Sequence, residues 1–283
     1  MAGSPTVRRR RLALELRRLR EEAALTIDEA AVAAHVSKSA LSRYESSEVP
    51  VKPNTVRGLA LAYGVSDVKT EALMILALEA GQRAWWQSYG SALSQQLAVY
   101  IGFEAEAASI RGYEQFVLPG LLQTRQYAEA IFKGRGESNR PDAEIEQRVA
   151  VRMKRQDRLN ELKVQFIIEE SALTRPIGGA AVMRDQVSRL VALSRKRNIT
   201  LQVMPHDIGI HPGVDGSFSI LGFADPKADP DLVYTETPAG ELWPDKPEDI
   251  SRMTRTFAEL STEALNSESS RKVLQRIIGS FDD

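Results

Sequence analysis

The sequence has no cysteine and only three histidines, His35, His206 and His211, among its 283 residues. The absence of cysteine excludes a disulfide framework, thiolate metal sites, iron–sulfur clusters and cysteine nucleophiles. No apolar run approaches the roughly 18 residues that a membrane span needs. The N-terminal arginines are not followed by an uncharged apolar stretch, which argues against a signal peptide. By elimination, we expect a cytoplasmic protein that does not bind membranes.

The charge of the chain is close to zero overall but uneven along its length. Apolar residues make up 43% and charged residues 27%, as in soluble globular proteins, and the length suffices for two domains. Residues 1–66 carry eleven Lys or Arg against seven Asp or Glu, whereas the remaining 217 residues carry twenty-six against thirty-one. A basic end on an acidic chain suits a polyanionic partner, although charge runs are more commonly just solvated surface.

The first 80 residues are predicted to form five short helices. Leu12, Leu16 and Leu19 recur at helical spacing between arginines and indicate an amphipathic first helix. Thr26, with a glutamate three residues later, forms a capping box that starts a second helix, and Ser37 can cap a third. Asn54 is expected to cap the fourth helix. The predicted second to fifth helices span about 27–34, 37–44, 54–64 and 67–81.

Two of these helices, separated by a tight turn, have the geometry of a helix-turn-helix. Small and apolar residues suit the contact between them: Ala30, Ala31, Ala34, Val36 and Leu41. Polar and basic residues lie on the outer side of the second one: Lys38, Ser39, Ser42 and Arg43. Because lysine and arginine donate to guanine O6 and N7, and serine bonds base edges or phosphate, this face fits the major groove of DNA. The alternative is an ordinary helical hairpin with a charged face.

The rest of the chain changes character. Strand-like runs at 164–169, 199–204, 218–223 and 232–237 are interleaved with helical stretches at about 180–194, 247–264 and 267–279. We therefore predict a mainly α protein with a smaller α/β part. Residues 1–80 form a five-helix DNA-binding domain, and residues 81–283 form a mixed domain with a small sheet of about four strands flanked by helices.

Two segments of the first domain resemble a known family. LTIDEAAVAAHVSKSALSRYESSE, from residue 25, and PNTVRGLALAYGVSD, from residue 53, are similar to the lambda/434 repressor-type helix-turn-helix of bacterial regulators, the xenobiotic-response-element type. The resemblance implies sequence-specific binding of double-stranded DNA, usually by a homodimer on a palindromic operator, and hence a place in the nucleoid. It implies that Lys38, Ser39 and Arg43 read bases and that Thr26 and Ser37 lie near phosphates.

Further residues complete the predicted DNA-binding set: Ser42, Lys52, Arg8, Arg9, Arg10 and Arg11. The sequence offers no packing role for the four consecutive arginines, which are expected either at the DNA backbone or in a solvated, frayed helix end. The resemblance also implies a structural ion pair between Arg20 and Glu45. The chain departs from the family pattern at Ile27, where glutamine is usual, and at His35, where glycine is usual. The first departure puts a backbone contact in doubt, and the second requires a left-handed or strained turn residue.

Segments of the second domain resemble a rarer pattern. These are GQRAWWQSYG, YIGFEAEAASIRGYEQFVLPGLLQTRQYAEAIF, RVAVRMKRQDRL, PIGGAAVMRDQV, ITLQVMPHDIGIHPGVDGSFSILGF and LVYTE. They are similar to a domain of unknown function that is fused to this helix-turn-helix in actinobacterial, notably streptomycete, regulators. The resemblance covers roughly residues 80–280. It implies an antitoxin-like regulator, often paired with a small protein encoded next to its gene.

Catalysis has little support in the sequence. His206, Asp207, His211 and Asp215 could supply a metal site or an acid–base pair, but they lie on a Gly- and Pro-rich stretch without the rigidity of a typical metal site. There is no P-loop and no dinucleotide-binding fingerprint. We expect no enzyme, no cofactor and no metal. His211 and Asp215, together with Trp85 and Trp86, are instead candidates for a partner or ligand surface, although a buried tryptophan is the commoner case.

Three functions stay open for the second domain. The leading one is binding of a small protein partner or dimerisation, because the N-terminal helices have few apolar residues left for a large interface. The second is sensing of a small molecule, which requires a pocket of several hundred Å³ with convergent polar groups. The third is a hydrolase with an accessory DNA-binding module, which requires a bonded nucleophile–base pair near His206 or His211.

Overall fold

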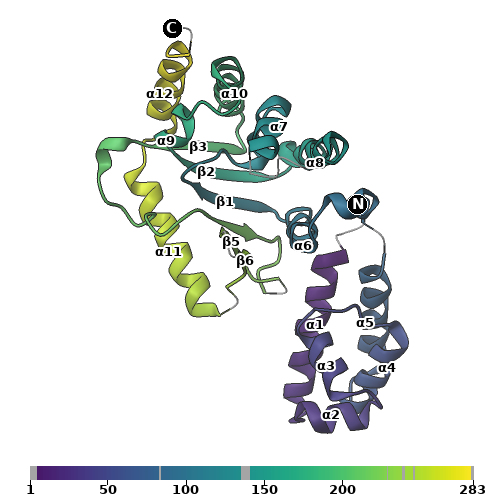
Figure 1. The fold of residues 1–283 in the computed structure, drawn as a ribbon. Coiled ribbons are helices and arrows are strands. Elements are labelled where there is room, and N and C mark those ends of the chain that lie inside the picture. The colour runs from purple at the N-terminus through teal and green to yellow at the C-terminus, as the bar shows by residue number, and fades with distance from the viewer. Residues whose placement is uncertain are drawn as a thin grey trace. The chain divides into compact units, whose positions relative to one another are not determined.

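A computed structural model of the chain describes residues 5–82, 84–134, 141–227, 229–237, 240–244 and 246–281. The chain divides into two compact units, Met1–Ser88 with Leu97–Glu106, and Tyr89–Gln96 with Ala107–Asp283. We call the first the helical unit and the second the sheet unit (Figure 1). The domain boundary expected between residues 80 and 81 stays a prediction. None of the described helices has the length and apolar character of a membrane span.

The helical unit contains the five predicted N-terminal helices and most of a sixth. Their bounds are α1 (Pro5–Glu22), α2 (Ile27–Ala33), α3 (Lys38–Glu45), α4 (Pro53–Ala62), α5 (Asp67–Ala80) and, after the 3-10 helix η1 (Trp85–Ala92), α6 (Gln95–Glu104). The core of α1 to α5 is apolar and includes the fully buried side chains of Leu12, Leu16, Leu41, Val56 and Leu59. The helical periodicity of the sequence therefore correctly predicts that the apolar residues of α1 are buried in this core.

The start of α4 differs from the prediction. Lys52, and not Asn54, is the N-cap residue, and its side chain makes no capping hydrogen bond. Pro53 is the first helical residue, because its fixed φ and missing N–H suit this position. Asn54 lies within the first turn, so its assignment as the cap was wrong.

Helices α1 to α4 all end with a left-handed residue directly after the cap. These residues are Ala24 (φ 55°), His35 (φ 53°), Ser47 (φ 63°) and Gly64 (φ 69°). After α2, the amide of Val36 donates to the carbonyl of Ala31 at 2.9 Å, and that of His35 donates to Val32, which is a Schellman motif. The left-handed turn residue predicted at His35 is confirmed. Three of the four residues are not glycine and carry a steric cost of about 1–2 kcal/mol each.

The sheet unit is built on six strands in the order β3-β2-β1-β4-β5-β6. Their bounds are β1 (Ser109–Glu114), β2 (Lys163–Glu169), β3 (Ile199–Met204), β4 (Phe218–Gly222), β5 (Leu232–Thr237) and β6 (Gly240–Leu242). Strand β1 is parallel to β2 and antiparallel to β4, β2 is parallel to β3, and the pairs β4–β5 and β5–β6 are antiparallel.

The prediction of about four strands missed β1 and β6. Strand β1 reads SIRGYE and has only two large apolar residues, Ile110 and Tyr113, so no alternating pattern separates it from the helical sequence before it. Strand β6 has three residues, fewer than the shortest run that strand periodicity can identify. The other four strands lie where the sequence predicts them.

Helices cover both faces of this sheet (Figure 1). On one face lie α7 (Arg125–Gly134), α8 (Asp142–Arg155) and α10 (Ala180–Leu193), and on the other lies α11 (Pro247–Glu263). Helix α12 (Ser267–Gly279) packs beside α10 and β3. Short helices complete the unit: η2 (Gly120–Leu122), η3 (Gln156–Asn160), α9 (Glu170–Thr174) and η4 (His206–Ile208). Between the sheet and α11, Tyr113, Phe218 and Val233 form a core with Phe257 and Leu260 of that helix.

Candidate functional site

Helix α2 starts at a complete capping box. The Thr26 hydroxyl oxygen accepts from the Glu29 amide at 3.2 Å, and a Glu29 carboxylate oxygen accepts from the Thr26 amide at 2.9 Å. Two bonds to the Glu29 carboxylate, one from the Thr26 amide and one from the Thr26 hydroxyl at 2.7 Å, hold the Glu29 pKa below its usual range. They fix the direction in which the chain enters α2, and they leave Thr26 exposed at the amino end of that helix.

Helix α3 is anchored on one side and exposed on the other. Its cap, Ser37, accepts from the Ala40 amide at 3.1 Å, and Leu41 is fully buried against the core of the helical unit. The polar residues on its outer side are all exposed: Lys38, Ser39, Ser42 and Arg43. The predicted base-reading residues therefore lie on one accessible face of a short helix whose inner face is fixed.

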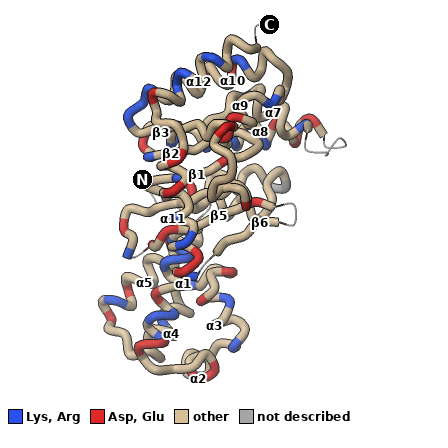
Figure 2. Tube along the Cα trace, turned by 90° about the vertical axis from the view of Figure 1, so that its left-hand side faces the viewer, with Lys and Arg blue, Asp and Glu red and all other residues tan. Residues whose placement is uncertain are grey.

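Both basic residues of α3 have acidic neighbours. Lys38 Nζ lies 2.8 Å from Asp28 Oδ2 of α2, and Arg43 Nε lies 3.5 Å from Glu48 Oε2 in the turn after α3. All four side chains are more than half exposed. Figure 2 shows the same pattern along the backbone, with basic segments on α3 and acidic ones on α2. The positive charge of this face is thus partly offset within the protein.

The structure brings Arg20 and Glu45 together. Arg20 Nε and one Nη donate to the two carboxylate oxygens of Glu45 at 2.7 and 2.9 Å, and the other Nη donates to the Leu25 carbonyl at 2.8 Å. The two side chains are only 10% and 6% exposed. The hydrogen bonds to Glu45 raise the Arg20 pKa. The pair ties the end of α3 to the end of α1 and so sets the position of the exposed face of α3.

The four consecutive arginines do have packing roles. Arg8 forms an ion pair with Glu79 of α5 at 3.2 Å, Arg9 is half-buried with its pKa lowered by burial, and Arg10 lies over the ring of Phe103 in α6. They occupy the end of α1 that is away from α2 and α3, about 14–18 Å along the helix from Arg20 (Figure 1). The expectation that these residues lack a packing role is therefore wrong for Arg8, Arg9 and Arg10, whereas Arg11 is exposed, and their contact with DNA stays a prediction.

The other predicted residues of the helical unit are scattered. Lys52 is exposed at the amino end of α4. Trp85 and Trp86 form an edge-to-face pair with ring centres 5.6 Å apart. Trp86 is buried, whereas Trp85 is about one-third exposed. The pair is therefore mostly core, and it is not brought together with Lys52 or α3.

His211 is a packing residue of the sheet unit. Its Nδ1 accepts from the Gly213 amide at 3.2 Å, and its Nε2 lies 3.1 Å from Glu169 Oε1. The Tyr113 hydroxyl donates to the same carboxylate oxygen at 2.5 Å, and burial together with this bond raises the Tyr113 pKa. With its side chain 8% exposed, His211 does not form the accessible surface that was predicted, although Asp215 is exposed. Within the described part of the chain, no cluster of acidic or histidine side chains is arranged to hold a metal ion.

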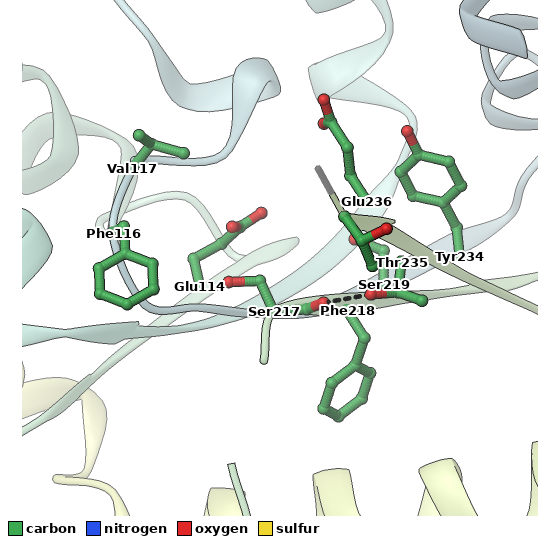
Figure 3. Close-up of a pocket in the computed structure, with 10 residues that line it drawn as sticks. Glu114, Phe116, Val117, Ser217, Phe218, Ser219, Tyr234, Thr235 and Glu236 are labelled. Carbon is green, nitrogen blue, oxygen red and sulfur yellow. Dashed lines mark hydrogen bonds between the residues drawn. The ribbon is translucent and has the colours of Figure 1, made fainter. Parts of the chain in front are cut away.

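A cavity of about 590 Å³ opens on the sheet unit near the ends of β1 and β5 and the start of β4. It is lined by Glu114, Phe116, Val117, Ser217, Phe218, Ser219, Tyr234, Thr235, Glu236 and Thr237. Figure 3 shows the two glutamates and Tyr234 on one side of the strands, whereas the ring of Phe218 points to the other side. The Thr235 hydroxyl donates to the Ser217 carbonyl at 2.9 Å. None of these residues was predicted, because they come from three segments far apart in the sequence.

Two protein families match the chain. A helix-turn-helix domain matches residues 11–73, which cover most of α1 to α5. A domain of unknown function, DUF5753, matches residues 97–276, which include all six strands. No curated protein and no solved structure matches the chain.

Proposed function

The chain belongs to the DUF5753 family and carries a helix-turn-helix domain, and we propose that it is a sequence-specific transcriptional regulator of the lambda/434 repressor type. The helix-turn-helix match itself indicates a DNA-binding regulator. One observation carries the finer proposal. Helix α3 presents Lys38, Ser39, Ser42 and Arg43 on a single exposed face, while its inner face is fixed by Leu41 and its carboxyl end by the Arg20–Glu45 pair.

Helix α3 has the dimensions to enter the major groove. An α-helix with its side chains is about 10–12 Å wide, and the groove is about 12 Å wide. Arg43 is the best candidate to read guanine, because its planar guanidinium matches O6 and N7 together. Lys38, one turn earlier, reaches a base or a phosphate, and Thr26, Ser37 and Lys52 are placed at helix starts, where phosphate contacts are common.

The experiment is a selection of bound sequences from random DNA, followed by affinity measurements on the selected site. Arg43→Ala is expected to weaken binding by about 1–3 kcal/mol and to relax the preference at one base position. Arg252→Ala is the matched control, since this α11 arginine is exposed and has an acidic neighbour, Asp249, as Arg43 has Glu48. If the Arg43→Ala variant kept the full preference for the selected site over other sequences, the role assigned to α3 would be refuted.

We infer that the regulator acts as a homodimer on a palindromic operator, with half-sites about 34–36 Å apart. We assign dimerisation to residues 81–283. The basis is the sequence argument that the N-terminal helices have few apolar residues for a large interface. The competing surface lies on the helical unit, where Leu61 of α4 and Val68, Ile75 and Leu78 of α5 are each more than half exposed. The test is to compare, by sedimentation, the oligomeric state of residues 1–106, which include α6, with that of the full chain. A dimeric fragment would refute the assignment.

Two roles compete for the sheet unit. The resemblance to antitoxin-like regulators supports the binding of a small protein encoded next to the gene. The cavity of about 590 Å³ supports the alternative, a regulator that senses a small molecule, because its volume falls within the 300–1,000 Å³ of ordinary ligand pockets and polar groups line it. This observation favours ligand sensing as the second candidate function.

A further inference from the structure

The inner part of the cavity floor contains Ser219 and Tyr234. The strand register pairs Gly112 of β1 with Ser219 of β4, and Ser219 with Tyr234 of β5, so these three residues lie side by side on one face. Phe218 points to the opposite face and packs under α11 (Figure 3). A side chain at Gly112 has no room, since its Cβ would lie 2.6 Å from the ring of Phe166. The Phe166 ring therefore covers Gly112, and Ser219 is the small residue that borders the cavity beside Tyr234.

The outer part of the floor carries two carboxylates. Side chains alternate between the faces of a sheet, so the next row on the same face consists of Glu114, Ser217 and Glu236. Neighbouring strands are about 4.8 Å apart, which separates the two glutamate backbones by about 10 Å with a small serine between them. Side chains of this length can converge on one group lying above Ser217.

Aromatic rings flank these carboxylates. Phe116 lines the cavity at the end of β1 and is exposed, and Tyr234 lines it from β5. Tyr234 is held against Trp243, with ring centres 4.8 Å apart. Aromatic faces attract cations through their quadrupole and provide apolar contact area for the body of a ligand.

The residues that line the cavity carry negative charge, and the guanidinium of Arg175 lies 5.9 Å from the centre of the Phe116 ring. Ten described residues line the cavity, and among them two are acidic and none is basic. The Tyr234 pKa is raised by burial and further by the charges of Glu236 and Glu241, with Arg155 acting in the opposite sense. Burial and Glu236 also raise the Glu241 pKa. Because the described residues supply no third carboxylate or histidine placed for a metal, an ammonium group suits the two carboxylates better than a metal ion.

We propose that this cavity is a binding site for a small organic cation, an amine attached to an aromatic or apolar body. Glu114 and Glu236 accept hydrogen bonds from the ammonium group, and Ser217 and Ser219 form hydrogen bonds with polar substituents of the ligand. Phe116 and Tyr234 contact the body. The proposal rests on the ligand-sensing role proposed above and names the chemical class of the ligand.

The test uses the full chain without DNA and three matched probes, 2-phenylethylamine, 2-phenylethanol and 3-phenylpropionate, in protein-detected NMR titrations at neutral pH. A probe of this size is expected to bind with a Kd of about 1 mM, because small ligands make few contacts. The amine is expected to bind at least ten-fold more tightly than the alcohol or the acid. Equal binding of the amine and the alcohol, or no binding of the amine, would overturn the proposal.

Variants identify the site. The double variant E114Q/E236Q is expected to lose at least ten-fold in amine affinity, whereas Glu259→Gln, at an exposed position of α11, is expected to bind as the parent chain does. Ser219→Leu fills the floor and leaves both carboxylates in place, so it is expected to abolish binding of the amine. Melting curves identify any variant that fails to fold. Unchanged amine binding by a folded E114Q/E236Q variant or a folded Ser219→Leu variant would refute the site.

Failure of this site and failure of the proposed function can be told apart. DNA binding is measured separately with the Arg43→Ala variant, which leaves the cavity intact. If the amine binds at the cavity but leaves the operator affinity unchanged, the site stands and the ligand-sensing role fails. If no amine binds while α3 reads its operator, the regulator stands and the cation site fails.

Discussion

Removal of one partner of the Arg20–Glu45 pair is expected to destabilise the helical unit strongly. The two hydrogen bonds of 2.7 and 2.9 Å join side chains that are about nine-tenths buried. Arg20→Ala leaves the Glu45 carboxylate buried without its counter-charge and also removes a donor from the Leu25 carbonyl. Breaking a buried pair in this way costs about 3–5 kcal/mol. We take the lower end, about 3 kcal/mol, because Glu45 lies at a helix end that can move towards water.

The expected change is large enough to measure directly. In a unit of about 100 residues, 1 kcal/mol shifts the melting temperature by about 4–8 °C, so Arg20→Ala is expected to lower the Tm of the helical unit by at least about 12 °C. The assay is thermal unfolding of the full chain followed by circular dichroism. Arg17→Ala is the control, because the Arg17–Glu21 pair on the same helix is more than half exposed and is worth less than about 1 kcal/mol.

A double-mutant cycle separates the interaction from the cost of an orphaned charge. R20M/E45L removes both charges, and it is expected to recover most of the stability lost by Arg20→Ala, because replacing a buried pair with apolar side chains is often neutral. An unchanged Tm in Arg20→Ala together with weaker DNA binding would refute the reasoning. In that case Arg20 would act on DNA and not on the position of α3.

Three further outcomes are expected. Arg8→Ala lowers the Tm through loss of its pair with Glu79 but leaves the salt dependence of DNA affinity unchanged. A slope of log affinity against log salt that falls by about one unit would show instead that Arg8 contacts a phosphate. His35→Gly raises the free energy of unfolding of the helical unit by about 0.5–1 kcal/mol, since glycine adopts φ 53° without strain. An unchanged free energy of unfolding in a denaturant titration would contradict this. Hydrogen bonding to Arg18 holds the Glu15 pKa at about 2, below its ordinary 4.5, so this group stabilises the fold above pH 4.5 and loses that effect as the pH falls towards 2. Glu15→Gln should therefore flatten the acid limb of a stability–pH curve, and an unaltered limb would contradict the assignment.

The helix-turn-helix was predictable because its signals are local. The Thr26–Glu29 capping box and the Ser37 cap each involve residues three apart, and the Schellman bonds around His35 span five or six residues. Such contacts depend only on short stretches of sequence, so they can be predicted without knowledge of the rest of the fold. The Arg20–Glu45 pair is twenty-five residues apart and was accessible only through the resemblance.

The cavity was not predictable for the opposite reason. Glu114, Ser217 and Glu236 become neighbours only through the register of β1, β4 and β5, and β1 itself was not predicted as a strand. Strand β4 reads FSILG and is buried throughout, with Ser219 as its single polar residue, a sequence that predicts a buried strand. It does not tell which strands lie beside it. The strand itself was thus predictable, whereas the topology that completes the pocket was not.

The net charge of the N-terminal end was an unreliable guide to the DNA-binding surface. Several of its arginines are paired within the helical unit, Arg8 with Glu79, Arg17 with Glu21, and Arg18 with Glu15 and Glu22. Such pairs offer less charge to phosphates, so we expect the affinity for DNA to come from α3 and the helix starts around it, where Lys38 is itself paired with Asp28. Each phosphate contact contributes about 0.9 to the slope of log affinity against log salt. Lys38, Thr26, Ser37 and Lys52 are the phosphate-contact candidates, and only two of them carry a charge. The salt slope should therefore lie near two per protomer, whereas participation of Arg8 to Arg11 would raise it towards six.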